Sequence, residues 1–220
     1  MAFLQLQTEV SDLLNMTIGT TSTVTLTQTK RDLNTARDLV FNKLLSLGQN
    51  YNVRLAKADL SADQELYGLP TDCRKLTRVE IGFEVSTNRF KVDRMDTNAE
   101  GDPTYTTYVQ NDPKYMVRGN NIEINPIPTS DVTDGLWLWY IEDATDMADD
   151  DATTTLPLDY DQLLPMYAAA KGSYKLGLHN EGNNYMALFR AGLEDMEMEI
   201  IERNMDGNDM IIAVDSYGGF

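Results

Sequence analysis

The sequence of 220 residues has little of what most catalytic and secreted folds depend on. It contains one cysteine, Cys73, and one histidine, His179. A single cysteine excludes an intramolecular disulfide framework and a metal site built from several cysteines. We find no glycine-rich phosphate loop, dinucleotide fingerprint or nucleophile elbow. Nothing in the pattern brings Cys73 next to His179, so we expect both residues to be structural. We expect the chain to have no catalytic residue and no cofactor.

Basic residues and long apolar runs are also scarce. The chain has 18 Lys and Arg against 35 Asp and Glu, and residues 141–220 alone carry 17 acids and 4 bases. A protein that grips nucleic acid needs a basic face, which this composition supplies poorly. No run of about 18 apolar residues occurs, and the N-terminus lacks the basic and apolar regions of a signal peptide. We therefore expect a soluble protein made in the cytoplasm, without a membrane span.

Four apolar stripes of helical period lie at the two ends of the chain. They cover residues 2–16, 29–47, 163–178 and 185–204. Thr29 is the expected N-cap of the second helix, with Asp32 in its first turn and Gly48 as its stop. Residues 17–28 lack helical period and indicate a loop or a short exposed strand. Residues 177–182 are expected to form the turn between the last two helices.

The middle of the chain, residues 51–143, has short apolar alternations separated by turn residues. This pattern predicts about six to eight short strands in a small antiparallel sandwich or open barrel. Residues 114–125 are expected to form a hairpin that turns at Gly119 and Asn120. In the segment 136–140, Trp137 and Trp139 alternate with Leu136, Leu138 and Tyr140, which indicates a strand buried on both faces.

These patterns predict an α+β fold. We expect a helical bundle core from residues 1–50 and 156–205, with an inserted antiparallel β-domain at 51–144. An acidic loop would occupy residues 145–155, and residues 206–220 would form an extended C-terminal tail.

Two acidic segments invite comparison with cation sites. Residues 96–101 partly imitate a calcium loop, but Thr107 stands where a closing bidentate Glu would be needed. The flanks are strand-like, so a solvated β-loop is the better interpretation. Three consecutive acids, Asp149, Asp150 and Asp151, could hold a cation loosely, although like charges in a row are typical of a solvated loop. The sequence therefore predicts no metal site.

The C-terminal segment has large apolar side chains and no partner of its own. They are Met210, Ile211, Ile212, Val214, Tyr217 and Phe220. Such a segment either folds back on its own domain or docks in a groove or on a sheet edge of another chain. The residues alone leave these two alternatives open.

The order of several short motifs resembles one protein family. The string Tyr67-Gly-Leu-Pro-Thr-Asp72 precedes the strand KLTRVEIGF, and Gly101-Asp-Pro-Thr-Tyr105 precedes the segment Ile122–Pro128. The strand LWLWYIE follows, and Leu156–Tyr160 then opens a helix that contains Ala168–Ala170. In this order the sequence resembles the tailed-phage head–tail adaptor (connector or neck) proteins over residues 29–207. The segment MEMEIIERNMDG is also similar to the gatekeeper (tubular A) proteins of short-tailed phages.

The resemblance implies a non-enzymatic virion protein of the neck between capsid and tail. It implies a homo-oligomeric ring, commonly a dodecamer, that binds the portal protein, extends the DNA channel and offers a docking platform to a tail or nozzle protein. The C-terminal segment would then contact the portal or a neighbouring subunit. DNA would pass without specific binding, and Asp149, Asp150 and Asp151 are candidates to face the channel.

Three other functions remain as alternatives. The chain could be another tail or neck completion protein, or a free-standing β-sandwich module that binds carbohydrate through its aromatic residues. An enzyme that uses carboxylates is the third alternative, and no motif supports it.

Overall fold

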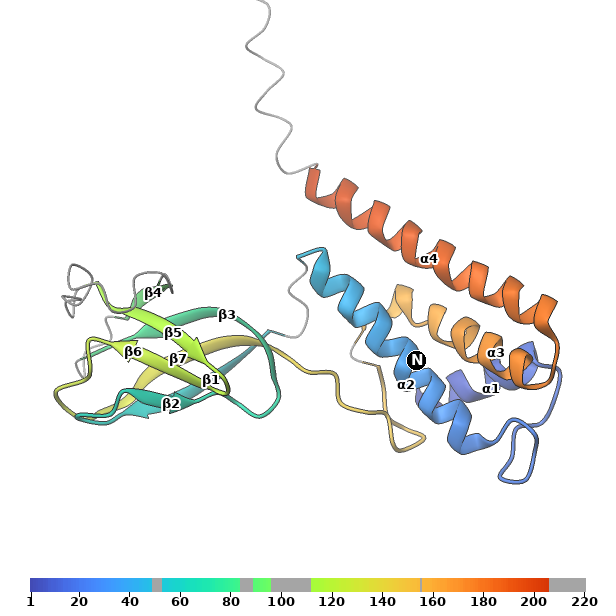
Figure 1. Cartoon of the computed structure of the whole chain (residues 1–220), viewed down its shortest axis with the longest axis horizontal. Coiled ribbons are helices and arrows are strands. Elements are labelled where there is room, and N and C mark those ends of the chain that lie inside the picture. The colour runs from blue at the N-terminus through green and yellow to red at the C-terminus, as the bar shows by residue number, and fades with distance from the viewer. Residues whose placement is uncertain (49–52, 84–88, 96–111, 155, 206–220) are drawn as a thin grey trace, which may run out of the picture. The chain divides into compact units, whose positions relative to one another are not determined.

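A computed structural model describes residues 1–48, 53–83, 89–95, 112–154 and 156–205. The chain divides into two compact units, residues 1–49 with 144–220 and residues 50–143. The described residues form four α-helices in the first unit and a seven-stranded sheet in the second (Figure 1). The predicted α+β class is confirmed.

The helical unit is built around one central helix. The helices are α1 (Phe3–Leu13), α2 (Leu26–Ser46), α3 (Leu163–Lys175) and α4 (His179–Met205), and a 3-10 turn, Leu158–Tyr160, precedes α3. Helix α3 packs against each of the other three. Its buried face includes the small residues Ala168, Ala169 and Gly172, which let neighbouring helices approach closely. The core of this unit includes Phe3, Leu6, Leu33, Val40, Leu164 and Phe189.

Three helix boundaries differ from the sequence prediction. The N-cap of α2 is Thr25, whose hydroxyl accepts from the Gln28 backbone N–H at 3.3 Å, and Thr29 lies within the helix. Both threonines precede acceptable first turns, so pattern alone could not choose between them. Helix α1 ends at Leu13 and not near residue 16. Helix α4 begins at His179, inside the expected turn, because Gly177 adopts a φ of 79° and reverses the chain within three residues.

The sheet has the strand order β1-β7-β3-β4-β5-β6-β2. Its strands are β1 (Val53–Leu60), β2 (Leu66–Gly68), β3 (Cys73–Ile81), β4 (Phe90–Arg94), β5 (Lys114–Arg118), β6 (Asn121–Asn125) and β7 (Val132–Glu142). Strands β4 and β5 pair in parallel, with Asp93 opposite Lys114, whereas the other pairs are antiparallel. The expectation of a wholly antiparallel β-domain was therefore wrong. The connection 95–113 is long enough for the crossover that a parallel pair requires.

The predicted hairpin of residues 114–125 is present. Strands β5 and β6 pair from Lys114 opposite Asn125 to Arg118 opposite Asn121, and Gly119 turns with a φ of 60°. The sheet core contains Leu60, Val79, Ile81, Ile122, Ile124, Leu136 and Leu138.

Strand β7 is buried mainly on one face. Leu136, Leu138 and Tyr140 are buried, whereas Trp137 and Trp139 are half-buried. The Trp137 ring is covered by two cations: the Lys57 Nζ lies 4.6 Å and the Arg89 guanidinium carbon 3.7 Å from its centroid. Cation–π contacts of this kind cover an aromatic face without burying it completely. The expected burial on both faces is therefore only partly correct.

Candidate functional site

The acidic segment after β7 is anchored to α2 by a buried arginine. Arg37 is 1% exposed, and its guanidinium donates to Asp146 Oδ1 at 2.9 Å and to the Thr145 carbonyl. It also donates to Asp38 Oδ1 at 2.6 Å and to Asn34 Oδ1 at 3.2 Å. The planar fork of arginine suits this convergence of carboxylate and carbonyl acceptors. Arg37 therefore fixes the beginning of the segment 145–155.

Two further residues of α2 hold the same segment. The Asn34 amide donates to the Met147 carbonyl at 3.1 Å and accepts from the Met147 N–H at 2.9 Å. The Lys30 ammonium donates to the Ala148 carbonyl at 3.3 Å and pairs with Asp150 at 3.2 Å. The two residues and Arg37 are spaced by four and three positions, so they lie along one face of the helix. This polar stripe was visible in the sequence, but its partners 108 to 120 residues away were not.

The far end of the acidic segment contacts α1. The Phe3 N–H donates to the Ala152 carbonyl at 2.8 Å, and the Leu4 N–H donates to the Asp150 carbonyl at 3.0 Å. These carbonyls satisfy amides of the first turn of α1, which have no partner within the helix. The segment is thus held at both ends.

Asp149, Asp150 and Asp151 form the exposed turn between these attachments. Asp150 pairs with Lys30, and its Oδ1 also lies 3.5 Å from the Gln7 amide nitrogen. Within the described residues, Asp149 and Asp151 make no ion pair. The acidic turn therefore presents at least two uncompensated carboxylates from a fixed position on the helical unit.

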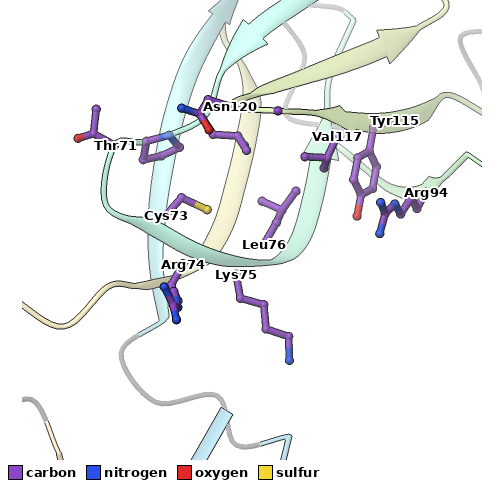
Figure 2. Close-up of a pocket in the computed structure, with 12 residues that line it drawn as sticks. Thr71, Cys73, Arg74, Lys75, Leu76, Arg94, Tyr115, Val117 and Asn120 are labelled. Carbon is purple, nitrogen blue, oxygen red and sulfur yellow. The ribbon is translucent and has the colours of Figure 1, made fainter. Parts of the chain in front are cut away.

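The sheet unit contains a hollow of about 580 Å³ with a basic rim (Figure 2). Arg74 and Lys75 of β3 and Arg94 of β4 are exposed at this rim, and Leu76, Tyr115 and Val117 supply apolar surface. Arg94 and Tyr115 are opposite each other in the parallel β4–β5 pair, and Figure 2 shows their side chains close together. Three cations around a small hollow favour an anionic group such as a carboxylate. The sequence did not reveal this site, because its residues come from separate strands.

The ionisable groups inside the hollow are poorly suited to nucleophilic chemistry. Burial raises the pKa of Cys73, and the negative charge of Asp72 raises it further. Burial also raises the pKa of Tyr115, which Arg94 lowers and Asp93 raises to smaller extents. A thiol with a raised pKa is largely protonated at neutral pH and reacts slowly. Cys73 belongs to the sheet unit and His179 to the helical unit, so the two are parts of different compact bodies.

The helical unit carries an apolar groove between α2, α3 and α4. The groove has a volume of about 620 Å³ and an apolar lining of Leu39, Tyr167, Met186, Phe189 and Leu193. The Tyr167 and Phe189 rings lie 5.2 Å apart, and Leu39 is 42% exposed. Three cations, Lys43, Lys171 and Arg190, stand around the groove.

Other expectations lie wholly or partly beyond the described residues. The calcium-like segment 96–101 and the six apolar residues of the C-terminal segment, Met210, Ile211, Ile212, Val214, Tyr217 and Phe220, fall outside them. In the part of the chain that the structure describes, no three His, Cys, Asp or Glu side chains are grouped as metal ligands. None of the helices described here is both long and apolar enough to cross a bilayer.

Taken together, the described surfaces are an anchored acidic turn, a basic-rimmed hollow and an apolar groove with cations around it. Surfaces of this kind are suited to contact with other macromolecules, which is the property of an assembly protein. Comparison with known families agrees: the chain belongs to the SU10 adaptor protein family, whose sequence model matches residues 1–211. This is a family of phage structural adaptors and not a known family of enzymes, so the resemblance to head–tail adaptors is confirmed. No curated protein matches the chain.

Proposed function

We propose that this adaptor forms a homo-oligomeric ring, a dodecamer, beneath the portal in the neck of the virion. The ring would prolong the DNA channel and offer a docking platform to a tail or nozzle protein. The observation that carries the proposal is the family match, which extends over residues 1–211 and so includes both units. The mixed character of the exposed surfaces, with acidic, basic and apolar regions on one chain, supports a protein that contacts several neighbours.

The C-terminal segment is the proposed attachment to the portal. Its apolar residues are Met210, Ile211, Ile212, Val214, Tyr217 and Phe220. An apolar segment of this length gains its binding energy when its side chains enter a groove or extend a sheet of the partner. The portal then supplies the apolar environment that the segment lacks in its own sequence neighbourhood.

The acidic turn is the proposed channel-facing element. Asp149, Asp150 and Asp151 follow a stretch that Arg37 attaches to α2, so their charges are held at a defined place. A duplex that must slide needs a surface that repels its phosphates, and carboxylates provide it. This role is the opposite of DNA gripping and agrees with a net charge of −17.

Portal binding by a shortened chain tests the proposal. A chain that lacks Met210–Phe220 should no longer bind purified portal protein in a pull-down or light-scattering assay, while its circular dichroism stays that of the full chain. A full-length variant with Asp209→Asn and Asp215→Asn keeps the apolar residues and serves as the control. Undiminished binding by the shortened chain would refute the attachment. Binding of the full chain to a tail component but not to portal would favour another neck or tail completion protein.

A glycan-binding module is less well supported. The exposed aromatic platform that such a module uses is not formed by Trp137, whose ring is covered by Lys57 and Arg89. Binding of the chain to glycans, without binding to portal, would reverse this order of preference.

A further inference from the structure

Helix α4 has a second apolar stripe on the side opposite its buried face. Phe189, Met196 and Ile200 point into the helical unit and are at most 3% exposed. Ala187, Ala191, Met198 and Ile201 follow the four- and three-residue spacing of a heptad seam, and all are exposed. We call these four residues the outer seam. Figure 1 shows α4 at the outside of the helical unit, beside α3.

The outer seam is unusually exposed for apolar residues of a helix. Met198 is 57% and Ile201 38% exposed, and the flanking Leu188 is 56% exposed. A helix that is apolar on both faces normally has a partner on each of them. Within the described residues the outer seam has none.

The charges at and beside the outer seam are mainly acidic, and Arg190, which also lines the groove, borders the seam on one side. Glu194 occupies a seam position, and Asp195 and Glu202 flank it. All three carboxylates are exposed, and none forms an ion pair with another described residue. A complementary surface must therefore offer apolar side chains between cations.

The groove between α2, α3 and α4 has this composition. Its floor is apolar, and Leu39 at its edge is 42% exposed. Lys171 and Arg190 stand at its border without an ion pair among the described residues, and Lys43 pairs with Glu197 at 2.6 Å. The Lys171 Nζ lies 5.2 Å from the centroid of the Tyr167 ring, so this cation stands over an aromatic ring of the groove lining. The groove thus combines apolar surface with cations, which are complementary to the apolar side chains and carboxylates of the outer seam.

We propose that the outer seam of α4 of one subunit docks in the α2–α3–α4 groove of the next. The inference rests on the proposed ring and names the contact between its subunits. At about 100° per residue, the groove positions Met186 and Leu193 lie about 120–140° around α4 from Met198, and Arg190 lies between the groove and the outer seam. One copy therefore carries two different, complementary surfaces. A head-to-tail contact of this type can repeat from subunit to subunit and forms a ring when its rotation closes, whereas a self-complementary contact stops at a dimer.

Two variants with complementary defects test the contact. The seam variant carries Met198→Asp and Ile201→Asp, and the groove variant carries Leu39→Asp and Lys171→Glu. All four residues are exposed, so both variants should fold and keep the circular dichroism of the unaltered chain. Each variant buries unpaired carboxylates on association and should weaken self-association by a factor on the order of 100, measured by sedimentation velocity. Leu66→Asp with Ile127→Asp, at exposed positions of the sheet unit, is the matched control and should associate normally.

Mixing the two variants gives the sharper result. The seam variant keeps an intact groove and the groove variant keeps an intact seam, so an equimolar mixture should form one-to-one dimers and nothing larger. Absence of these dimers, or normal association of either variant alone, would overturn the inference. So would an unaltered chain that stays monomeric at about 1 mM and also on portal.

Portal binding separates this inference from the proposed function. If the full chain binds portal as a ring and both variants do the same, the docking contact is refuted and the adaptor function stands. If the variants form mixed dimers but the full chain ignores portal, the contact stands and the portal-binding function is refuted.

Discussion

The guanidinium of Arg37 on α2 and the carboxylate of Asp146 meet at 2.9 Å across 109 residues of sequence. This ion pair joins the first half of the helical unit to the segment that returns from the sheet unit. Arg37 is almost completely buried, whereas Asp146 is mostly exposed. The beginning of the acidic segment is therefore attached to the packed helical unit through Arg37, although Asp146 itself and the turn that follows are exposed.

Replacement of Arg37 should destabilise the helical unit and free the acidic segment. The change Arg37→Ala removes hydrogen bonds to a carbonyl and to carboxylates and leaves a cavity, so we expect a loss of about 2–4 kcal/mol of unfolding free energy. Urea denaturation measures this loss. Limited proteolysis should show faster cleavage within residues 145–155.

Arg31→Ala is the control for this change. Arg31 lies on the same helix, is 72% exposed and faces Asp32 at 3.6 Å. An exposed pair of this kind contributes about 0–1 kcal/mol. Equal losses for the two arginine variants would show that the attachment of the acidic segment is not what stabilises the unit.

Asp32 should make stability depend on pH. Burial raises its pKa, and the nearby Arg31 only partly opposes this effect. The folded state then holds the Asp32 proton more tightly than the unfolded state does. Protonation of Asp32 therefore adds stability as the pH falls through the raised folded-state pKa, and this added stability is lost as the pH rises through the same pKa. Asp32→Asn should therefore increase the unfolding free energy at pH 7.

The stabilisation by Asp32→Asn should shrink as the pH is lowered below the raised pKa, where the aspartic acid is itself neutral. Denaturation curves of both proteins between pH 4 and pH 7 measure the difference. A difference that is independent of pH would assign the effect to helix propensity and not to the buried charge.

Cys73 should react slowly with alkylating reagents. Because burial and Asp72 raise its pKa, the thiolate fraction at pH 8 is smaller than that of an unfolded cysteine. We expect iodoacetamide to modify the folded chain several-fold more slowly than the chain in urea, with the rate rising steadily above pH 8. Asp72→Asn should accelerate the reaction. A folded rate equal to the unfolded rate would contradict the raised pKa.

Gly182 of α4 packs directly against the Tyr174 ring of α3 and leaves no room for a side chain. A Cβ at this position would lie 2.6 Å from Cδ1 and Cε1 of Tyr174, whose hydroxyl donates to Asn183 at 2.9 Å. Overpacking costs about 1–3 kcal/mol, which exceeds the gain of about 1 kcal/mol that alanine has over glycine in a helix. Gly182→Ala should therefore lower thermal stability. Gly19→Ala, with no atom within 4 Å of the added carbon, should not.

Sequence pattern predicted those elements whose determinants are local. The apolar period located all four helices, and the turn residues Gly119 and Asn120 located the β5–β6 hairpin. The N-cap of α2 was misplaced because Thr25 and Thr29 are chemically equivalent and only the backbone distinguishes them. The parallel pairing of β4 with β5 depends on how a long connection returns, which local pattern does not encode.

The candidate sites were harder to predict, because they depend on residues that are distant in sequence. The three aspartates were found from composition, but their attachment through Lys30, Asn34 and Arg37 required the fold. The basic-rimmed hollow and the apolar groove combine side chains from several strands or helices. Each of these side chains alone looked like an ordinary surface or core residue.

The pairing of β1 with β7 has a consequence for how this chain can change. Val53 lies opposite Ile141, so the two ends of the sheet unit are neighbouring strands with Cα atoms about 5 Å apart. A short flexible linker can therefore replace the whole unit without stretching the polypeptide that remains. The sheet unit can therefore be exchanged as a whole. Its size and surface can diverge among relatives while the helical unit keeps one geometry.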